Sequence, residues 1–209
     1  MSESRPFSLS LSDLTRIAVF AALVAALGLA GAVSLFGNAV PITLQTLGVM
    51  LAGTILGAWR GAISMTVLLA LVAVGLPLLS GGRGGFGVFL GPSAGYLLGW
   101  VAGAAVIGLI AAPRRGARPR AWRVLVACLV GGIGVVYLIG VPVQSLVTGV
   151  PLAETALLSL AFVPGDLVKA VLATLITSAV AKAYPAAFGG RRAASSPAEP
   201  SISSSTTAS

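Results

Sequence analysis

The sequence has no histidine, a single cysteine and few charged residues. Charged residues make up 9% of its 209 residues, whereas about a quarter of a soluble domain is charged. Without histidine the chain has no histidine-based metal, haem or catalytic site, and Cys128 alone cannot form a disulfide within the chain. We therefore predict no metal ligands, no catalytic residues and no cofactor bound by this chain.

Apolar sequence is what the chain has in abundance. Hydrophobic residues make up 57% of it, and its mean hydropathy is +1.03. Apolar runs of about 18 to 20 residues recur, and at a rise of about 1.5 Å per residue each run covers roughly the 30 Å of the hydrocarbon layer. The sequence therefore predicts an all-α integral membrane protein with six transmembrane helices, at 14–36, 41–59, 62–79, 93–112, 122–141 and 164–183.

The two ends of the chain differ from this apolar middle. Residues 1–13 are predicted to form a cytoplasmic segment, 14–184 the membrane domain, and the Ser- and Thr-rich residues 185–209 a disordered cytoplasmic tail. The apolar run from Ile17 to Phe36 is longer than that of a signal peptide, and no cleavage site stands out. We expect it to remain as a permanent helix.

Basic residues indicate the orientation of the helices, because Lys and Arg accumulate in short cytoplasmic loops. If the spans alternate, nearly all of them fall on one side: Arg5, Arg16, Arg60, the five arginines of 114–123, Lys182, Arg191 and Arg192. Only Arg83 and Glu154 fall on the other side. Both termini are thus expected to be cytoplasmic, and the loops around 36–40, 77–92 and 142–163 to face outward. Cytoplasmic retention explains the net charge of +8 better than a nucleic-acid partner does.

Stripes of small residues suggest how the helices meet. In a bilayer, helices associate by close packing, which small side chains four positions apart permit. Three stripes are present: Ala18, Ala22, Ala26 and Ala30; Gly53, Gly57 and Gly61; and Gly91, Gly95, Gly99 and Gly103. Any one stripe has a plain compositional explanation, since Ala and Gly are abundant. We expect the last stripe to pack inside the bundle and the alanine stripe to face another membrane subunit.

Polar residues gather in three clusters on the predicted outward side. In the first, at 40–47, Thr43 and Gln45 offer a hydroxyl and an amide to a cavity; alternatively they lie in the membrane interface. The second, at 79–96, has enough glycine for its backbone to approach a ligand or to fold as a lid. A plain flexible connection is its alternative, and Arg83 within it is suited to attract an anionic solute.

The third cluster is Phe162–Lys169, inside a predicted span. Pro164 suits the first turn of a helix, where unpaired N–H groups favour the carboxylate of Asp166, and Lys169 lies three residues further on the same face. A charge in the middle of a bilayer costs roughly 2.5–3.5 kcal/mol on insertion scales. The pair therefore binds a ligand, binds an ion or serves as a structural ion pair.

These three clusters resemble, in order and spacing, the BioY family of biotin transporters. The residues that carry the resemblance are Val40–Thr46, Gly81–Tyr96 and Phe162–Lys169, and the likeness extends over roughly 14–184. BioY proteins are the substrate-binding S components of energy-coupling-factor (ECF) transporters. The resemblance implies an S-component-like bundle in the cell membrane of a prokaryote, which captures biotin from outside with high affinity.

The resemblance also implies partners and binding residues. Transport would need a membrane coupling subunit and a pair of ATPases, which use ATP on behalf of this subunit. Ala18, Ala22 and Ala26 match the Ala-x-x-x-Ala face that meets the coupling subunit. Asp166 and Lys169 would contact the vitamin. Other residues whose side chains or backbone suit biotin are Thr43, Gln45, Arg83, Gly85, Phe86, Phe89, Tyr96 and Phe162.

Two other classes of function fit the sequence less well. An intramembrane protease is disfavoured, because the chain has no histidine for a Ser–His pair and Asp166 has no partner carboxylate at the same depth. A self-sufficient secondary transporter of biotin or a related small vitamin is the stronger alternative. The chain has no nucleotide-phosphate loop, so it cannot hydrolyse ATP itself.

Overall fold

The computed structural model describes residues 10–33, 40–113, 119–185 and 188. The predicted cytoplasmic segment up to residue 9, three of the loop arginines (Arg114, Arg115 and Arg118) and the predicted tail at 189–209 lie outside the described residues.

Helices form nearly all of the regular structure in these ranges. The helices are α1 (Leu11–Leu29), α2 (Gln45–Leu56), α3 (Ala58–Ala73), α4 (Ala94–Ala111), α5 (Ala121–Ala127), α6 (Val136–Thr148), α7 (Leu152–Ser159) and α8 (Val163–Ala183). Two 3-10 turns, η1 (Phe86–Phe89) and η3 (Leu160–Phe162), and a π-helix, η2 (Cys128–Val135), complete the helical elements. The strands of the described part are β1 (Ala32–Val33) and β2 (Ile42–Thr43), which pair antiparallel with Ala32 opposite Thr43.

Four helical stretches of the described chain are long and apolar enough to cross a membrane. They are Leu11–Leu29, Ala94–Ala111, Ala121–Thr148 and Leu152–Ala183. Helices α2 and α3 are shorter, with 12 and 16 residues, so the predicted spans 41–59 and 62–79 were too long. Every residue of α2 from Gly48 to Thr54 is buried within the protein. Hydropathy could not distinguish such a protein-enclosed helix from a lipid-facing one, because both are apolar all round.

The predicted ends of the first span were also wrong. A capping box begins α1 at Leu11, since the Ser10 hydroxyl accepts from the backbone N–H of Asp13 and the Asp13 carboxylate accepts from that of Ser10. The helix ends at Leu29 rather than at residue 36. The described chain after it contains the short β1 strand, which apolar composition does not distinguish from a helix.

The predicted outward loop at 142–163 is mostly helical. Pro142 lies within α6 without ending it, and the helix stops only at Gly149, which has a left-handed φ of +72°. Helix α7 begins at Leu152 and leads through η3 into α8. Pro164 lies in the first turn of α8, as the sequence predicted, and the 3-10 turn η3 directly precedes that helix.

Three glycines of the predicted stripe, Gly95, Gly99 and Gly103, pack inside the bundle, whereas Gly91 lies before α4 and is not packed against another α-helix of the described chain. A side chain at Gly95 would meet Val143, one at Gly99 would meet the backbone of Val136, and one at Gly103 would meet the carbonyl oxygen of Gly131 at 2.7 Å. These contacts bring α4 against η2 and α6, and α4 also packs on α2 and α3. Its central position explains why α4 has buried residues along its whole length.

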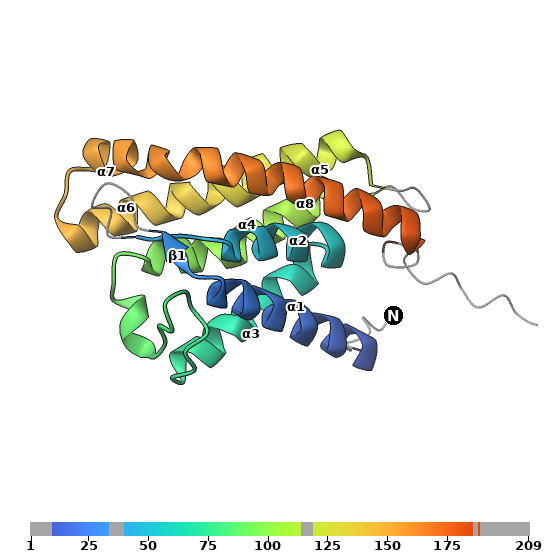
Figure 1. Ribbon diagram of the computed structural model, residues 1–209, viewed down its shortest axis with the longest axis horizontal. Coiled ribbons are helices and arrows are strands. Elements are labelled where there is room, and N and C mark those ends of the chain that lie inside the picture. Colours follow the sequence, from blue (N-terminus) through green and yellow to red (C-terminus); the bar gives the residue numbers. More distant parts are fainter. Residues whose placement is uncertain (1–9, 34–39, 114–118, 186–187, 189–209) are drawn as a thin grey trace, which may run out of the picture.

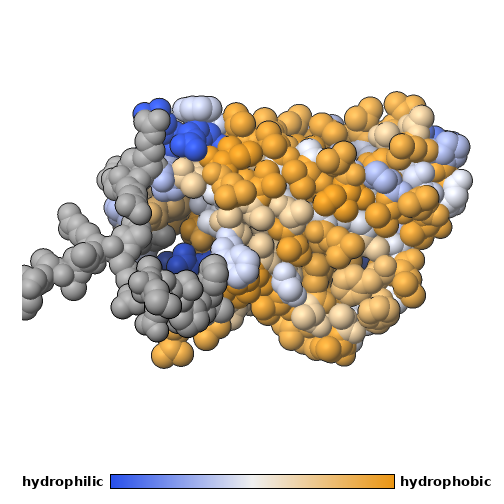
Figure 2. All heavy atoms as spheres, turned by 180° about the vertical axis from the view of Figure 1, so that it is seen from behind, coloured by the Kyte–Doolittle hydropathy of each residue, from blue (hydrophilic) through white to orange (hydrophobic). Residues whose placement is uncertain are grey.

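The chain runs back and forth along the long axis of the molecule. Figure 1 shows the start of α1, the start of α5 and the end of α8 at one end, and the β1 strand, the end of α6 and α7 at the other. At the first end Arg60 Nε lies 2.8 Å from Asp13 Oδ1, which joins α3 to α1. The face seen in Figure 2 is apolar over its middle, and its hydrophilic residues lie mainly toward the two ends.

Candidate binding site

A cavity opens near the end of the molecule that carries the β1–β2 hairpin. Its empty volume is about 570 Å³, part of which is open to the surroundings. The lining comes from the β2 strand, from the loop between α3 and η1, from the starts of α2, α4 and α8, and from η3 and α6. The lining residues are Val40, Pro41, Ile42, Thr43, Gln45, Thr46, Leu79, Arg83, Ser93, Tyr96, Leu97, Trp100, Val136, Tyr137, Phe162, Asp166 and Lys169.

The Asp166–Lys169 ion pair lies at this cavity. Asp166 is in the first turn of α8, and the Lys169 ammonium lies 2.9 Å from its Oδ1 atom. Both residues are buried, with 4% and 5% of their surface exposed. The sequence-based prediction that Asp166 lies in the first turn of the helix and shares a face with Lys169 is confirmed.

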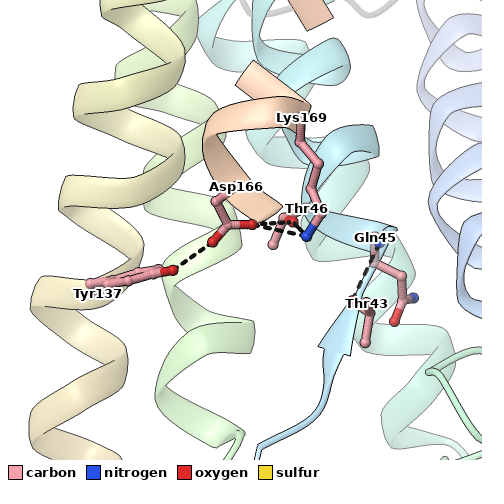
Figure 3. Close-up of polar contacts among 6 residues, drawn as sticks. All are labelled: Thr43, Gln45, Thr46, Tyr137, Asp166 and Lys169. Atoms are coloured by element: carbon pink, nitrogen blue, oxygen red, sulfur yellow. Dashed lines mark hydrogen bonds and ion pairs between the residues drawn. The ribbon is translucent and has the colours of Figure 1, made fainter. Parts of the chain in front are cut away.

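Two hydroxyl groups complete the hydrogen bonds of this pair (Figure 3). Thr46 accepts from Lys169 Nζ at 3.0 Å and donates to Asp166 Oδ1 at 3.2 Å, while Tyr137 donates to Asp166 Oδ2 at 2.6 Å. The carboxylate thus has a donor on each oxygen. Within the described chain Lys169 uses two of its three N–H donors, which leaves one for a ligand.

Aromatic rings form one wall of the cavity. Tyr96, Tyr137 and Phe162 contact one another edge to face, with ring centroids 6.1, 6.2 and 6.4 Å apart. Trp100 lies one helical turn beyond Tyr96 and also lines the cavity. The hydroxyl of Tyr96 donates to Gln144 Oε1 at 2.9 Å and lies 3.0 Å from Ser159 Oγ, so it is directed into the protein. This wall suits a flat, largely apolar ligand group.

Arg83 contributes a positive charge to the same cavity. Its Nε donates to the Ser80 carbonyl oxygen at 3.2 Å, and its Nη1 donates to Ser93 Oγ at 3.3 Å. Neither partner is a carboxylate, and the described residues form no ion pair with Arg83. The guanidinium is therefore held in place by neutral groups and can bind an anion.

The structure brings seven of the ten predicted binding residues together. The seven that line the cavity are Thr43, Gln45, Arg83, Tyr96, Phe162, Asp166 and Lys169. Gly85 and Phe86 are not among the lining residues, and neither is Phe89. Phe86 is 67% exposed, and the Gly85 N–H instead donates to the carbonyl oxygen of Val72, near the end of α3, at 2.8 Å.

The lining residues that were not predicted as binding residues include Thr46, Trp100 and Tyr137. Thr46 directly follows Gln45 in the first polar cluster, so its position was a usable signal. Tyr137 was the only tyrosine in the predicted span 122–141, which was a weaker signal. The π-helix η2 ends just before it and changes which residues of this helix face α8, and a sequence pattern with helical spacing does not reveal such a change.

Comparison with known proteins identifies the family. The family model described as the BioY family matches residues 1–186. This chain belongs to the BioY family. It is 44% identical over 181 residues to the biotin transporter BioY of Rhizobium etli, covering 85% of this chain and 97% of that protein. It is 45% identical over 189 residues to the biotin transporter BioY of Rhodobacter capsulatus, covering 86% of this chain and 98% of that protein.

A solved structure supports the same assignment. The 2.1 Å crystal structure of the S component for biotin from an ECF-type ABC transporter superposes with a TM-score of 0.76 at 32% identity, covering 84% of this chain and 95% of that one. This BioY-family chain therefore has the S-component fold and is a multi-pass membrane protein. The cavity lining, from Val40 to Lys169, lies wholly within the residues that match the BioY model.

Proposed function

We propose that this protein captures biotin from outside the cell as the substrate-binding S component of an ECF transporter. The observation that carries the proposal is the buried Asp166–Lys169 pair at an aromatic-walled cavity, in a chain of the BioY family. A buried ion pair whose two charges balance, inside a membrane protein, is suited to a small polar ligand rather than to an ion alone.

Biotin has chemical groups that match this cavity. Its ureido ring has two N–H donors and a carbonyl acceptor, and its sulfur-containing ring is apolar. Asp166 can accept from a ureido N–H, while the remaining N–H of Lys169 can donate to the ureido carbonyl. The rings of Tyr96, Tyr137 and Phe162 can enclose the apolar part. We place the ring end at Asp166 and the carboxylate near Arg83, the cation of the lining that has no acidic partner among the described residues.

The topology that fits this function has six crossings with both termini in the cytoplasm. Helices α2 and α3 would make the two short crossings, and α2 is largely enclosed by the rest of the protein. This topology places four basic residues of the described chain at the cytoplasmic side: Arg60, Arg120, Arg123 and Lys182. Exposed aromatic residues near the same helix ends, Trp59, Trp122 and Tyr184, support it, because such residues favour the membrane interface. We retain 14–184 as the membrane domain, with cytoplasmic segments at 1–13 and 185–209.

The proposed partners are a membrane coupling subunit and two ATPases. Ala18, Ala22 and Ala26 of α1 are all exposed, whereas the other side of that helix is buried against the bundle through Ile17, Ala21, Val24 and Gly28. The alanine row therefore forms a smooth strip on which another membrane helix can pack closely.

A binding titration tests the proposed ligand. We expect the purified protein to bind biotin saturably in isothermal titration calorimetry, and dethiobiotin more weakly because it lacks the sulfur that the aromatic wall encloses. Absence of saturable binding of both compounds would contradict the proposal. Tighter binding of dethiobiotin would keep the site but change its substrate.

The second candidate, a self-sufficient transporter, differs in its source of energy. Uptake of labelled biotin by cells that lack every coupling subunit and coupling ATPase separates the two. We expect uptake to be lost in such cells and restored when the partner subunits are supplied. Full uptake without them would contradict the subunit assignment.

Replacing Tyr137 with Phe is expected to weaken biotin binding by about tenfold. A hydrogen bond to a charged group contributes about 1.5–3 kcal/mol, and a water molecule that replaces the lost hydroxyl recovers part of that free energy. The hydroxyl that is removed is the donor to Asp166 Oδ2. Tyr96→Phe is the matched control, since its hydroxyl bonds to Gln144 and Ser159 instead. For this control we expect thermal melting to show a loss of stability, and calorimetry to show a smaller loss of biotin affinity than for Tyr137→Phe. Equal losses of affinity would contradict the role given to Tyr137.

A further inference from the structure

Gln45 lines the cavity, but its side-chain amide is bonded to backbone groups of two other segments. Its Nε2 donates to the carbonyl oxygens of Val24 in α1 and Leu78, each at 3.2 Å. Its Oε1 accepts from the backbone N–H of Ser80 at 3.2 Å. Figure 3 shows the amide directed away from Asp166 and Lys169. The side chain is almost fully buried, with 1% of its surface exposed.

The partners of this amide fix its orientation and leave it little to offer a ligand. The opposite orientation would place an oxygen against two carbonyl oxygens, so the nitrogen must face Val24 and Leu78. Both N–H donors are then used. A ligand that accepted from this amide would have to displace a buried backbone carbonyl and leave it without a donor, which is unfavourable.

The segment that Gln45 holds is the 76–85 loop, which we define as the residues from Leu76 to Gly85. Two of its side chains, Leu79 and Arg83, line the cavity. The loop is closed on itself by the Leu79 N–H, which donates to the Arg83 carbonyl oxygen at 3.0 Å. Holding the backbone at Leu78 and Ser80 therefore also fixes where Leu79 and Arg83 lie relative to the cavity.

Gly28 of α1 provides an independent observation of the same contact. A methyl group on Gly28 would lie 2.8 Å from the Leu78 carbonyl oxygen and 2.9 Å from Gln45 Nε2. Only a residue without a side chain permits this approach of the loop to α1. Gly28 does not line the cavity, so it shapes the contact without touching a bound ligand.

We infer that Gln45 is a positioning residue, whose amide fastens the 76–85 loop to α1 and α2 so that Leu79 and Arg83 retain a ligand in the cavity. This inference rests on the proposed function for the identity of the ligand, biotin. It replaces the direct polar contact with the ligand that the sequence suggested for Gln45. The expected consequence is kinetic: freeing the loop speeds the escape of biotin.

Two variants test the inference from different sides. Gln45→Met keeps the length of the side chain but removes all three hydrogen bonds to Val24, Leu78 and Ser80. Gly28→Ala keeps glutamine at position 45 but places a methyl group against both its amide and the Leu78 carbonyl oxygen, which forces the contact apart. It does not weaken the helix, because Ala is the better helix former. Leu29→Ala is the matched control, because Leu29 is the neighbouring residue in α1 and is 78% exposed.

Hydrogen exchange without ligand and dissociation of labelled biotin are measured for each variant. We expect both test variants to exchange the 76–85 amides about tenfold faster and to release biotin about tenfold faster, with a nearly unchanged association rate. A tenfold change is of the size expected, because each lost hydrogen bond contributes only modestly to the net free energy. The control should match the unaltered protein. If the two changes were independent, the dissociation rate of the double variant would rise by the product of the two single effects. We expect a clearly smaller rise, because both changes act on one contact.

The outcomes separate this inference from the proposed function. If the unaltered protein binds no biotin, the proposed function fails, whereas the exchange data still test the loop contact. If it binds biotin and Gln45→Met lowers affinity without faster exchange of the loop, Gln45 contacts the ligand directly and the inference is wrong. If Gly28→Ala leaves both rates unchanged, the loop contact does not retain the ligand and the inference is also wrong.

Discussion

Replacing Asp166 with Asn, or Lys169 with Met, is expected to lower biotin affinity by about thirtyfold or more, which corresponds to about 2 kcal/mol. Each change removes one half of a buried pair whose charged atoms lie 2.9 Å apart. The remaining charge is then left in the cavity without its counterpart, and the ligand loses a polar contact. Calorimetry measures the affinity and thermal melting the stability.

The double variant Asp166→Asn with Lys169→Met distinguishes a binding pair from a structural ion pair. It removes both charges, so much of the stability lost in the single variants should return. Affinity should stay low if the pair contacts biotin. Recovery of both would show that the pair serves packing alone. Lys182→Met is the control, because Lys182 lies in the last turn of the same helix and is exposed.

Replacing Ala22 with Leu is expected to abolish uptake of biotin in cells while changing its affinity for the purified protein by no more than about twofold. Ala22 is exposed in the middle of the alanine row, so a larger side chain there has room beside the described residues of this chain. It would, however, hold a partner helix away from α1. Co-purification with the coupling subunit measures assembly directly.

Two controls accompany this variant. Val19→Leu also enlarges an exposed side chain of α1, but outside the alanine row, and it should leave uptake intact. Ala22→Gly keeps the row small and should likewise be tolerated by the partner. Loss of both uptake and biotin binding in Ala22→Leu would indicate misfolding, and unimpaired uptake would contradict the proposed interface.

The hydrogen bonds around Asp166 explain how a carboxylate is tolerated at this depth. Its two oxygens receive donors from Lys169, Thr46 and Tyr137, and Lys169 balances its charge. A polar group is costly in a membrane protein chiefly when it is buried without partners. The site is therefore stable without ligand, and a ligand that binds there exchanges hydrogen bonds rather than satisfying a free charge.

Much of this site could be predicted from local sequence. Pro164 marks the start of α8, and the spacing of Asp166 and Lys169 places them on one face of that helix. Neither feature depends on how the rest of the chain folds. The glycine stripe likewise indicated that α4 is packed inside the bundle. These features depend on residues a few positions apart, and helical geometry connects them directly.

Other features could not be predicted in this way. Thr46 and Asp166 are 120 residues apart, and their hydrogen bond exists only because α2 and α8 pack together. Gln45 lies in a polar cluster that suggested a ligand contact, but its amide bonds to backbone groups from α1 and the 76–85 loop. The sequence shows which side chains have hydrogen-bonding groups, whereas the partners of those groups depend on how distant segments meet.

The sequence by itself determined that this is an all-helical membrane protein, that an acid and a base share the start of its last helix, and that small residues form strips on several helices. Composition and short-range periodicity carry that information, because solubility in lipid and the geometry of one helix are local properties. Only the tertiary structure decided that α2 is enclosed by protein, that Tyr137 reaches Asp166, and that Gln45 holds a loop. Those facts depend on close packing between helices, which no local pattern specifies.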